Sequence, residues 1–90
     1  RQSAVEELAD ELVLNQGLMI VVGGYNSSNT RKLLEVCQEK SVPAHHIENE
    51  DQLESDWFQG FGHVGITAGT STPHEVVDAV HRRIEAFSSQ

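Results

Sequence analysis

Hydrophobic and polar positions follow two different periods along the chain, and these periods predict helices and strands in turn. Apolar residues spaced three and four apart predict a helix over 4–15, where Ser3 and Glu6 have the spacing of a capping box. The continuous apolar run Leu18–Val22 is typical of a strand covered on both faces, as in a parallel sheet. The helical period then returns over 30–40.

The second half of the chain also alternates between strand and helix. Residues 44–47 predict a short strand, and the acidic stretch over 48–56 predicts an exposed turn or short helix. Trp57 and Phe58 are expected to fasten this stretch to the core. A third strand is predicted over 63–67.

The last helix has the clearest boundary signals. It is predicted over 73–87, with Thr72 as its N-cap, Pro73 in its first turn and Glu75 completing a capping box. Its expected buried face comprises Val76, Val77, Val80, Ile84 and Phe87.

Strands that alternate with helices are joined by right-handed crossovers and usually form a parallel sheet between helical layers. We therefore expect an α/β fold: a three-layer helix/sheet/helix arrangement with a small, mostly parallel sheet of about three strands. Ninety residues suffice for a single domain over 1–90. Because such a sheet is small and the first residue is Arg1 rather than methionine, we expect the chain to be a segment of something longer, with a strand or a neighbouring domain upstream.

Composition and charge narrow the class of protein. The apolar fraction of 38% is typical of a globular domain. Fourteen acidic against six basic residues give a net charge of −8, which disfavours nucleic acid and anionic membrane surfaces as partners. The longest apolar run is too short to cross a bilayer. The single cysteine, Cys37, cannot form an internal disulfide and is compatible with a reducing compartment.

Two loops, "GGYNSSNT" and "AGTSTP", share one design. Each follows an apolar strand with glycine and small hydroxyl or amide side chains, and each leads into a helix. Because the carboxyl ends of parallel strands meet at one edge of a sheet, we expect the loops to lie together. The free N–H groups and positive dipole end of each helix favour an anion there, and Gly23, Gly24 and Gly69 would let the backbone come close to it. The pattern predicts a phosphate or diphosphate pocket.

Helix capping is the alternative explanation, since Asn, Ser and Thr cap helices of any function. Two such loops at the same edge make binding about as well supported as capping, and four contiguous polar residues where one cap suffices favour binding a little further. Arg31 and Lys32 oppose the dipole in the first turn of the predicted helix, and we expect both to point to water.

The remaining reactive groups predict no second site. Four possible metal ligands lie close in sequence: His45, His46, Glu48 and Asp51. Their spacing matches no specific metal site, and an exposed acidic turn explains them better. Cys37 falls on the apolar face of its helix, where we expect a buried, unreactive thiol. The other histidines have no triad spacing, although His74 lies in the first turn of the last helix, beside the predicted pocket.

The paired motifs "VVGGYNSSNT" and "VGITAGTSTP", in this order, resemble the carboxy-terminal third of the LytB/IspH family of 4-hydroxy-3-methylbut-2-enyl diphosphate reductases. The resemblance covers essentially the whole chain and implies the C-terminal unit of a three-unit reductase built around a [4Fe-4S] cluster. It implies the last reductive step of the methylerythritol phosphate route, in which two electrons, usually from ferredoxin or flavodoxin, remove an allylic hydroxyl to give isopentenyl and dimethylallyl diphosphates. It also implies a cytoplasmic location in bacteria, or a plastid location in a photosynthetic eukaryote.

The resemblance assigns substrate-binding residues motif by motif. Ser27, Ser28 and Asn29 match the family's diphosphate-binding Ser, Ser and Asn, and Ser71 matches the serine of its second loop. Thr70 stands where the family often has alanine, and it could alter the packing beside Ser71 without removing that hydroxyl.

The resemblance places the catalytic groups elsewhere. The family's cluster is held by three cysteines, its glutamate and histidines come from earlier units, and Cys37 matches none of the three ligands. The third ligand cysteine precedes an "RQ" that resembles Arg1 and Gln2. We therefore expect no catalytic residue and no metal ligand here, and an isolated segment that folds, binds phosphate weakly and does not catalyse. Two alternatives stay open: a standalone phosphate-binding α/β module without redox chemistry, and a structural domain whose polar loops only cap helices.

Overall fold

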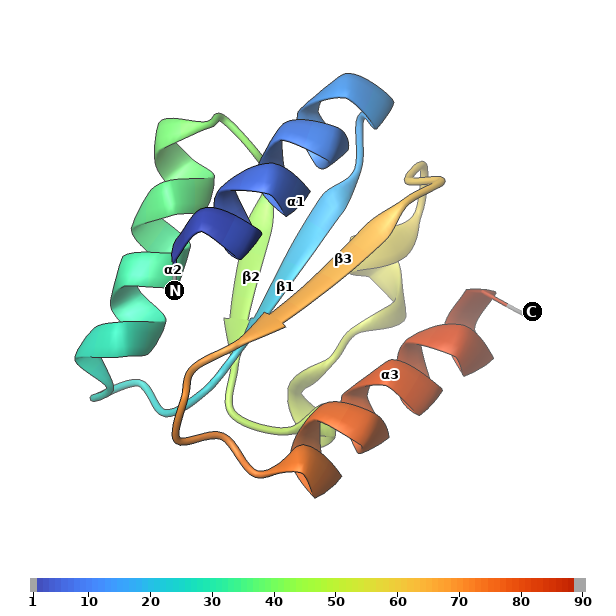
Figure 1. Ribbon diagram of the computed structural model, residues 1–90. Coiled ribbons are helices and arrows are strands. Elements are labelled where there is room, and N and C mark those ends of the chain that lie inside the picture. Colours follow the sequence, from blue (N-terminus) through green and yellow to red (C-terminus); the bar gives the residue numbers. More distant parts are fainter. Residues whose placement is uncertain (1, 89–90) are drawn as a thin grey trace.

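The computed structural model describes the backbone of residues 2–88 and the side chains of residues 7–87. The helices and strands follow one another along the chain as α1 (Gln2–Asn15), β1 (Leu18–Val22), α2 (Ser28–Glu39), β2 (Ala44–Ile47), the 3-10 turns η1 (Glu50–Gln52) and η2 (Ser55–Phe58), β3 (Val64–Ala68) and α3 (His74–Ser88) (Figure 1).

The three strands form one parallel sheet in the order β2-β1-β3, with β1 in the middle. Leu18 of β1 pairs with Val64 of β3, and Met19 pairs with Ala44 of β2. Helices α1 and α2 cover one face of the sheet, whereas α3 covers the other together with η1 and η2 (Figure 1). The α/β class and the three-layer arrangement predicted from the sequence are confirmed.

Strand β1 is the centre of two hydrophobic clusters, because successive side chains of a strand point to opposite faces. Met19 and Val21 pack beneath α1 and α2, while Leu18, Ile20 and Val22 pack against the α3 side. All five side chains are at most 1% exposed. This complete burial explains why β1 reads as a continuous apolar run rather than an alternating one.

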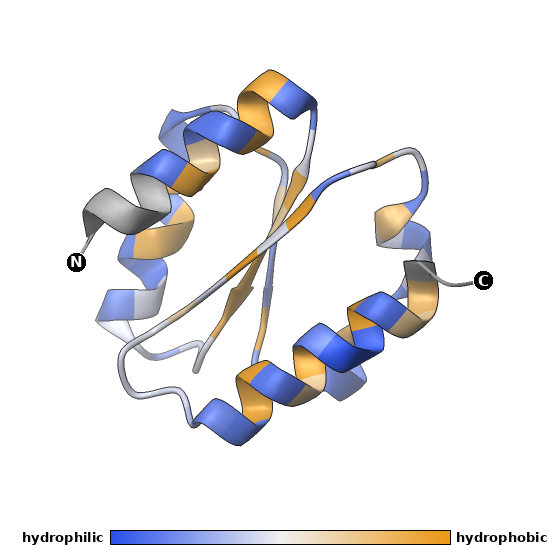
Figure 2. Ribbon diagram, turned by 45° about the vertical axis from the view of Figure 1, so that its right-hand side comes forward, coloured by the Kyte–Doolittle hydropathy of each residue, from blue (hydrophilic) through white to orange (hydrophobic). Residues whose placement is uncertain are grey.

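The helices supply apolar faces that match these two clusters. Hydrophobic residues alternate with hydrophilic ones along each helix (Figure 2). Val80 and Ile84 of α3 are buried on one side of the sheet, and Leu33 and Cys37 of α2 are buried on the other. No helix in the described part of the chain is long and apolar enough to cross a bilayer.

The boundaries of β1 and β2 agree with the sequence predictions, while the helix starts differ. Helix α1 begins at Gln2, before the predicted start at residue 4, and the side chains of its predicted capping box, Ser3 and Glu6, lie outside those described. Helix α2 begins at Ser28, two residues before the predicted start at residue 30, because the N-cap is Ser27. Ser28 and Asn29, which were predicted to lie in the loop, therefore belong to the first turn of α2.

At the other end of the chain, β3 covers Val64–Ala68, one residue later than predicted, and α3 begins at His74 rather than at Pro73. Thr72 was predicted to cap α3. Its hydroxyl instead donates to the backbone carbonyl of Val22 at 3.2 Å. This residue therefore ties the loop before α3 to the end of the central strand.

The acidic stretch over 48–56, predicted as an exposed turn or short helix, contains η1 and the start of η2. Trp57 and Phe58 of η2 are half-buried against the α3-side cluster, as predicted. The Trp57 ring also stacks on the imidazole of His45 from β2, with 4.0 Å between ring centroids and 5° between planes. The stretch is thus held to both the sheet and α3.

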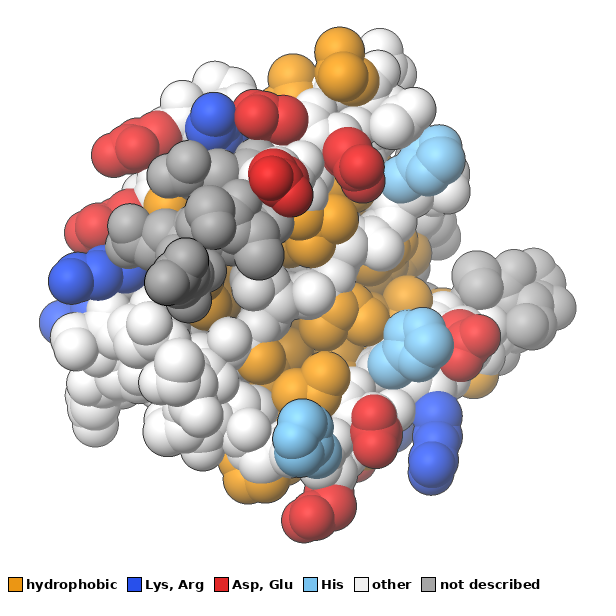
Figure 3. Space-filling model, viewed as in Figure 1, with side chains coloured by type: hydrophobic (Ala, Val, Ile, Leu, Met, Phe, Trp, Pro, Cys, Tyr) orange, Lys and Arg blue, Asp and Glu red, His pale blue; other side chains and the backbone are white. Residues whose placement is uncertain are grey.

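A hollow of about 480 Å³ lies between η2, β3 and α3. Hydrophobic side chains gather between β3 and α3 on this face of the molecule (Figure 3). The lining includes Phe58, Val64, Ile66, Ile84 and Phe87. None of the residues predicted to bind an anion lines this hollow.

Candidate functional site

The two polar loops meet at the carboxyl edge of the sheet. One follows β1 and the other follows β3, its immediate neighbour, so both leave the sheet side by side (Figure 1). The backbone N–H of Gly69 donates to the carbonyl of Val22 at 3.0 Å, which joins the start of the second loop to the end of β1. The prediction that the loops share one edge is confirmed, and we call residues 23–29 and 69–72 together the cradle.

Asn29 links the two halves of the cradle directly. Its side-chain Oδ1 accepts a hydrogen bond of 2.9 Å from the backbone N–H of Thr70, 41 residues away along the chain. While Oδ1 accepts this bond, Nδ2 is the group of the Asn29 side chain that can donate to a ligand. A donor beside a helix start suits an anion.

Ser27 has the capping role that the alternative explanation assigned to the loop. Its Oγ accepts from the backbone N–H of Thr30 at 3.3 Å, and its carbonyl accepts from the N–H of Arg31 at 3.1 Å. Since the first four N–H groups of a helix have no partner within the helix, those of Ser28 and Asn29 remain as donors at the start of α2. Capping therefore accounts for Ser27 but not for its three polar neighbours.

The structure brings together the four residues that the family resemblance assigns to the diphosphate. Ser27 and Asn29 are half-buried, whereas Ser28 and Ser71 are exposed. All four lie on the cradle, and each carries at least one N–H or O–H donor. The arrangement can present several hydrogen-bond donors to one anion at the positive end of a helix dipole.

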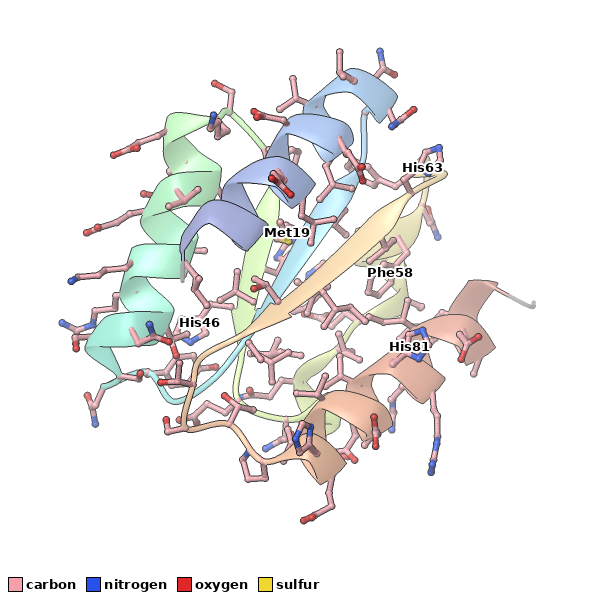
Figure 4. All side chains as sticks on the ribbon, viewed as in Figure 1. Met19, His46, Phe58, His63 and His81 are labelled. Atoms are coloured by element: carbon pink, nitrogen blue, oxygen red, sulfur yellow. The ribbon has the colours of Figure 1, made fainter. Side chains whose placement is uncertain are left out.

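Strand β2 fastens the first loop from the side opposite β3. His46 Nε2 lies 2.9 Å from the carbonyl oxygen of Gly23, so Nε2 carries the proton and donates it. Glu48 Oε2 accepts from the backbone N–H of Tyr25 at 3.2 Å, and the Tyr25 ring meets the His46 ring edge-on at 4.7 Å. His46 lies near the carboxyl edge of the sheet (Figure 4). This role of His46 could not be predicted from the sequence, because the contact depends on the alignment of β2 with β1.

Arg31 also belongs to this support. Its side chain is exposed, as expected, and Nε also donates to the carbonyl of Tyr25 at 3.3 Å. Lys32 is exposed as expected. The two cations place positive charge near the cradle of a chain whose net charge is −8.

Thr30 lies beneath the cradle and was not singled out from the sequence. It is fully buried, and its Oγ1 has no hydrogen-bond partner among the described residues. A Cβ built at Gly23 or at Gly69 would collide with this oxygen, whereas one at Gly24 would meet only Glu48 Oε2 at 3.9 Å. Two of the three predicted glycines are therefore required by the packing on Thr30. A buried hydroxyl without a partner costs about 1–3 kcal/mol.

The histidines and acidic residues considered as metal ligands do not converge. His45 and His46 are neighbours in β2 and point to opposite faces of the sheet, one stacking on Trp57 and the other reaching Gly23. Burial lowers the pKa of His45, and the negative charge of Glu54 partly offsets that effect. His63 lies at the opposite end of the sheet and His81 on α3 (Figure 4).

Across the residues that the structure describes, no three His, Cys, Asp or Glu side chains come together as possible metal ligands. Cys37 is buried in the cluster beneath α1 and α2, and burial raises the pKa of its thiol. These residues do not fit an iron-sulfur cluster. His74 is exposed at the start of α3, and its side chain makes no hydrogen bond or ion pair with the described residues of the cradle.

The LytB protein family model matches residues 1–85 of the chain. Among curated proteins, the 4-hydroxy-3-methylbut-2-enyl diphosphate reductase of Geotalea uraniireducens (strain Rf4) is 50% identical over 83 residues, which are 92% of this chain and 29% of that protein. The reductase of the same name from Geobacter sulfurreducens (strain ATCC 51573 / DSM 12127 / PCA) is 44% identical over 90 residues, or 100% of this chain and 30% of that protein.

A solved structure of (E)-4-hydroxy-3-methyl-but-2-enyl diphosphate reductase, described as the terminal enzyme of the non-mevalonate pathway, superposes on the chain with a TM-score of 0.87 and 41% identity. The match covers 96% of this chain and 29% of that one. The chain thus spans about 30% of the length of the curated relatives it matches. The match over residues 1–85, the sequence identity and the shared fold together show that the chain belongs to the LytB protein family.

Proposed function

We propose that the chain is the diphosphate-binding, C-terminal unit of a three-unit 4-hydroxy-3-methylbut-2-enyl diphosphate reductase. The observation that carries the proposal is the hydrogen bond from Thr70 N–H to Asn29 Oδ1, which holds the two polar loops together at the start of α2. The similarity to reductases of that name supports the same substrate. Residues 1–90 form one α/β domain in this proposal.

Ser27, Ser28, Asn29 and Ser71 are the proposed diphosphate ligands. Ser28 and Ser71 offer exposed hydroxyls, and Asn29 offers Nδ2. The oxygen of Ser27 caps α2, but its hydroxyl hydrogen is free to donate, since accepting one bond does not use it. Diphosphate oxygens are acceptors that carry charge, and hydrogen bonds to charged groups are stronger than neutral ones.

The reductive chemistry is assigned to the rest of the enzyme. In the proposed reaction, two electrons and two protons replace an allylic hydroxyl with hydrogen and release water, giving isopentenyl and dimethylallyl diphosphates. The [4Fe-4S] cluster would be held by other units, because the described residues of this chain provide no ligand set for it. Ferredoxin or flavodoxin is the proposed electron donor, and the cytoplasm, or the plastid of a photosynthetic eukaryote, the proposed location.

Titration of the isotopically labelled chain with inorganic pyrophosphate tests the binding role. We expect the amide resonances of Ser28, Asn29 and Ser71 to shift in a saturable way. Replacing Ser28 or Ser71 by alanine should weaken binding about tenfold, the loss typical of one hydrogen bond to a charged group. Ser55→Ala, on the far side of the sheet, is the matched loss of a hydroxyl and should leave binding unchanged. If the titration saturates without shifting the amide resonances of the cradle, the polar loops would serve only to cap the helices.

A chimaera tests the proposed enzyme. This chain aligns over its full 90 residues with part of the Geobacter sulfurreducens reductase and can replace that part. We expect the chimaera to retain reductase activity and the Ser71→Ala chimaera to lose it mainly through a higher KM. A folded, cluster-containing chimaera that binds pyrophosphate but cannot reduce the substrate would contradict the assignment of the enzyme while leaving anion binding intact.

A further inference from the structure

We propose that Thr30 is a positioning residue of the cradle, and that its hydroxyl gains a hydrogen bond when an anion binds. This inference rests on the proposed anion site and adds to it a residue that acts from beneath the two loops. Thr30 is the third residue of α2, next to Asn29, and it is completely buried.

The side chain of Thr30 sets the separation of the two loops. A Cβ at Gly23, in the first loop, would collide with Thr30 Oγ1 and lie 3.0 Å from Thr30 Cγ2. A Cβ at Gly69, in the second loop, would collide with the same oxygen and lie 3.4 Å from Asn29 Oδ1. One threonine therefore contacts the backbones of both loops.

The Thr30 hydroxyl has no hydrogen-bond partner among the described residues, and the hydrogen bonds of the cradle hold the oxygens of the two loops in place. The carbonyl of Gly23 accepts from His46, and the carbonyl of Val22 accepts from Gly69 N–H and from the Thr72 hydroxyl. Asn29 Oδ1 accepts from Thr70 N–H. The Gly69 α-carbon faces both Thr30 Oγ1 and Asn29 Oδ1, so a change in the bond from Thr70 would let the Asn29 side chain turn its oxygen towards the Thr30 hydroxyl.

An anion in the cradle provides such a change. Its oxygens accept backbone N–H donors at the start of a helix and in the adjoining loop, and Thr70 N–H is one of the donors in reach of the cradle. Once the anion takes that donor, Asn29 Oδ1 is released beside Thr30 and can accept from its hydroxyl. The exchange leaves each donor with an acceptor, whereas the present arrangement leaves one buried donor without any.

The alternative is that Thr30 only fills space. Valine has nearly the same shape and no hydroxyl, so a residue with a purely packing role would be replaced by valine without loss of function. The structure therefore separates the two roles by chemistry: the methyl group serves packing, and the hydroxyl serves binding.

Thr30→Val is the decisive variant, measured by thermal unfolding and by titration with inorganic pyrophosphate. We expect its unfolding midpoint without anion to equal or exceed that of the parent chain, and its affinity for pyrophosphate to fall about tenfold, equivalent to about 1.4 kcal/mol. The amide of Thr70 should shift on binding in the parent chain and shift less in the variant. Thr67→Val makes the same chemical change in β3 and should leave affinity within about twofold of the parent.

Thr30→Ser keeps the hydroxyl and removes the methyl group. We expect it to unfold at a lower temperature than the parent chain but to bind pyrophosphate with nearly the parent affinity. Equal affinity in Thr30→Val and the parent would overturn the inference and leave the proposed anion site standing, and so would a loss of affinity in Thr30→Ser as large as in Thr30→Val. Absence of binding by the parent chain would overturn both.

Discussion

Gly69 lies where β3 passes into the second loop, and its α-carbon faces the side chain of Thr30. A larger residue at Gly69 would collide with Thr30. The atoms it would meet belong to a short, buried side chain in the first turn of α2, not to the far end of a long, flexible side chain. Single-residue geometry of this kind controls how closely the two loops approach.

Gly69→Ala is therefore expected to destabilise the chain by about 1–3 kcal/mol, the usual cost of overpacking. Urea denaturation of both proteins measures the difference. Gly62→Ala is the matched control, since nothing lies within 4 Å of a Cβ there, and it should change stability by no more than about 0.5 kcal/mol.

A double-mutant cycle assigns the cause of the Gly69→Ala effect. If the added methyl group collides with Thr30, then Gly69→Ala should cost less in a Thr30→Ala background, where that side chain is shortened. Additive costs of the two substitutions would show that the collision lies elsewhere.

The residues of the cradle were predictable from sequence to different degrees. The resemblance supplied Ser27, Ser28, Asn29 and Ser71, but the sequence did not show that Ser27 is the cap of α2. The bond from Thr70 to Asn29 and the burial of Thr30 were not predictable, because both depend on how β3 aligns with β1. A threonine near a helix start has the same local pattern whether it is exposed or buried.

At the scale of elements, strands were predicted better than helix ends. The apolar run of β1 lies between Gly17 and Gly23, and β2 lies between Pro43 and Glu48, so the bounds of both strands could be read directly. Helix α2 began two residues before its predicted start because any of Asn26, Ser27, Ser28 and Asn29 could have served as the cap. All four residue types are good N-caps, so the sequence alone did not distinguish them, and the tertiary contacts of the loop determine that Ser27 is the cap.

The contact between β2 and η2 makes the fold sensitive to pH. His45 stacks on Trp57, and burial lowers the pKa of His45 from its ordinary value of 6.5. In the pH range between the lowered pKa and 6.5, the unfolded chain binds more protons at this site than the folded chain does, so stability rises with pH. We expect the free energy of unfolding to decrease as pH falls from 7 towards 5.

His45→Phe keeps an aromatic ring against Trp57 and removes the titrating group. Its free energy of unfolding should depend less steeply on pH over the same range, which urea denaturation at several pH values measures. Identical pH dependence in the two proteins would show that another group is responsible.

At the scale of the whole molecule, β1 contributes side chains to both hydrophobic clusters, one on each face of the sheet. Cys37 lies in the cluster beneath α1 and α2 and is completely buried, and burial raises the pKa of its thiol. Both effects slow reaction with alkylating reagents, which need an accessible thiolate.

We therefore expect iodoacetamide to modify Cys37 at least about 100-fold more slowly in native buffer than in denaturant, because reaction requires the domain to open. Mass spectrometry of samples quenched over time measures the rate. A rate in native buffer close to that of the unfolded chain would show that the cluster around Cys37 opens locally.

We expect the sheet order to affect the order in which the strands pair during folding. Strand β1 is the first strand in the sequence, and both of its neighbours in the sheet come later. Met19 pairs with Ala44 of β2, and Leu18 pairs with Val64 of β3, which is more distant in the sequence. Closing the longer loop carries the larger entropic cost, and distant pairings slow folding. Asn29 can bond to Thr70 only when β3 lies beside β1, so the cradle is complete only in chains whose β3 has paired with β1, and a ligand held there would stabilise those molecules alone.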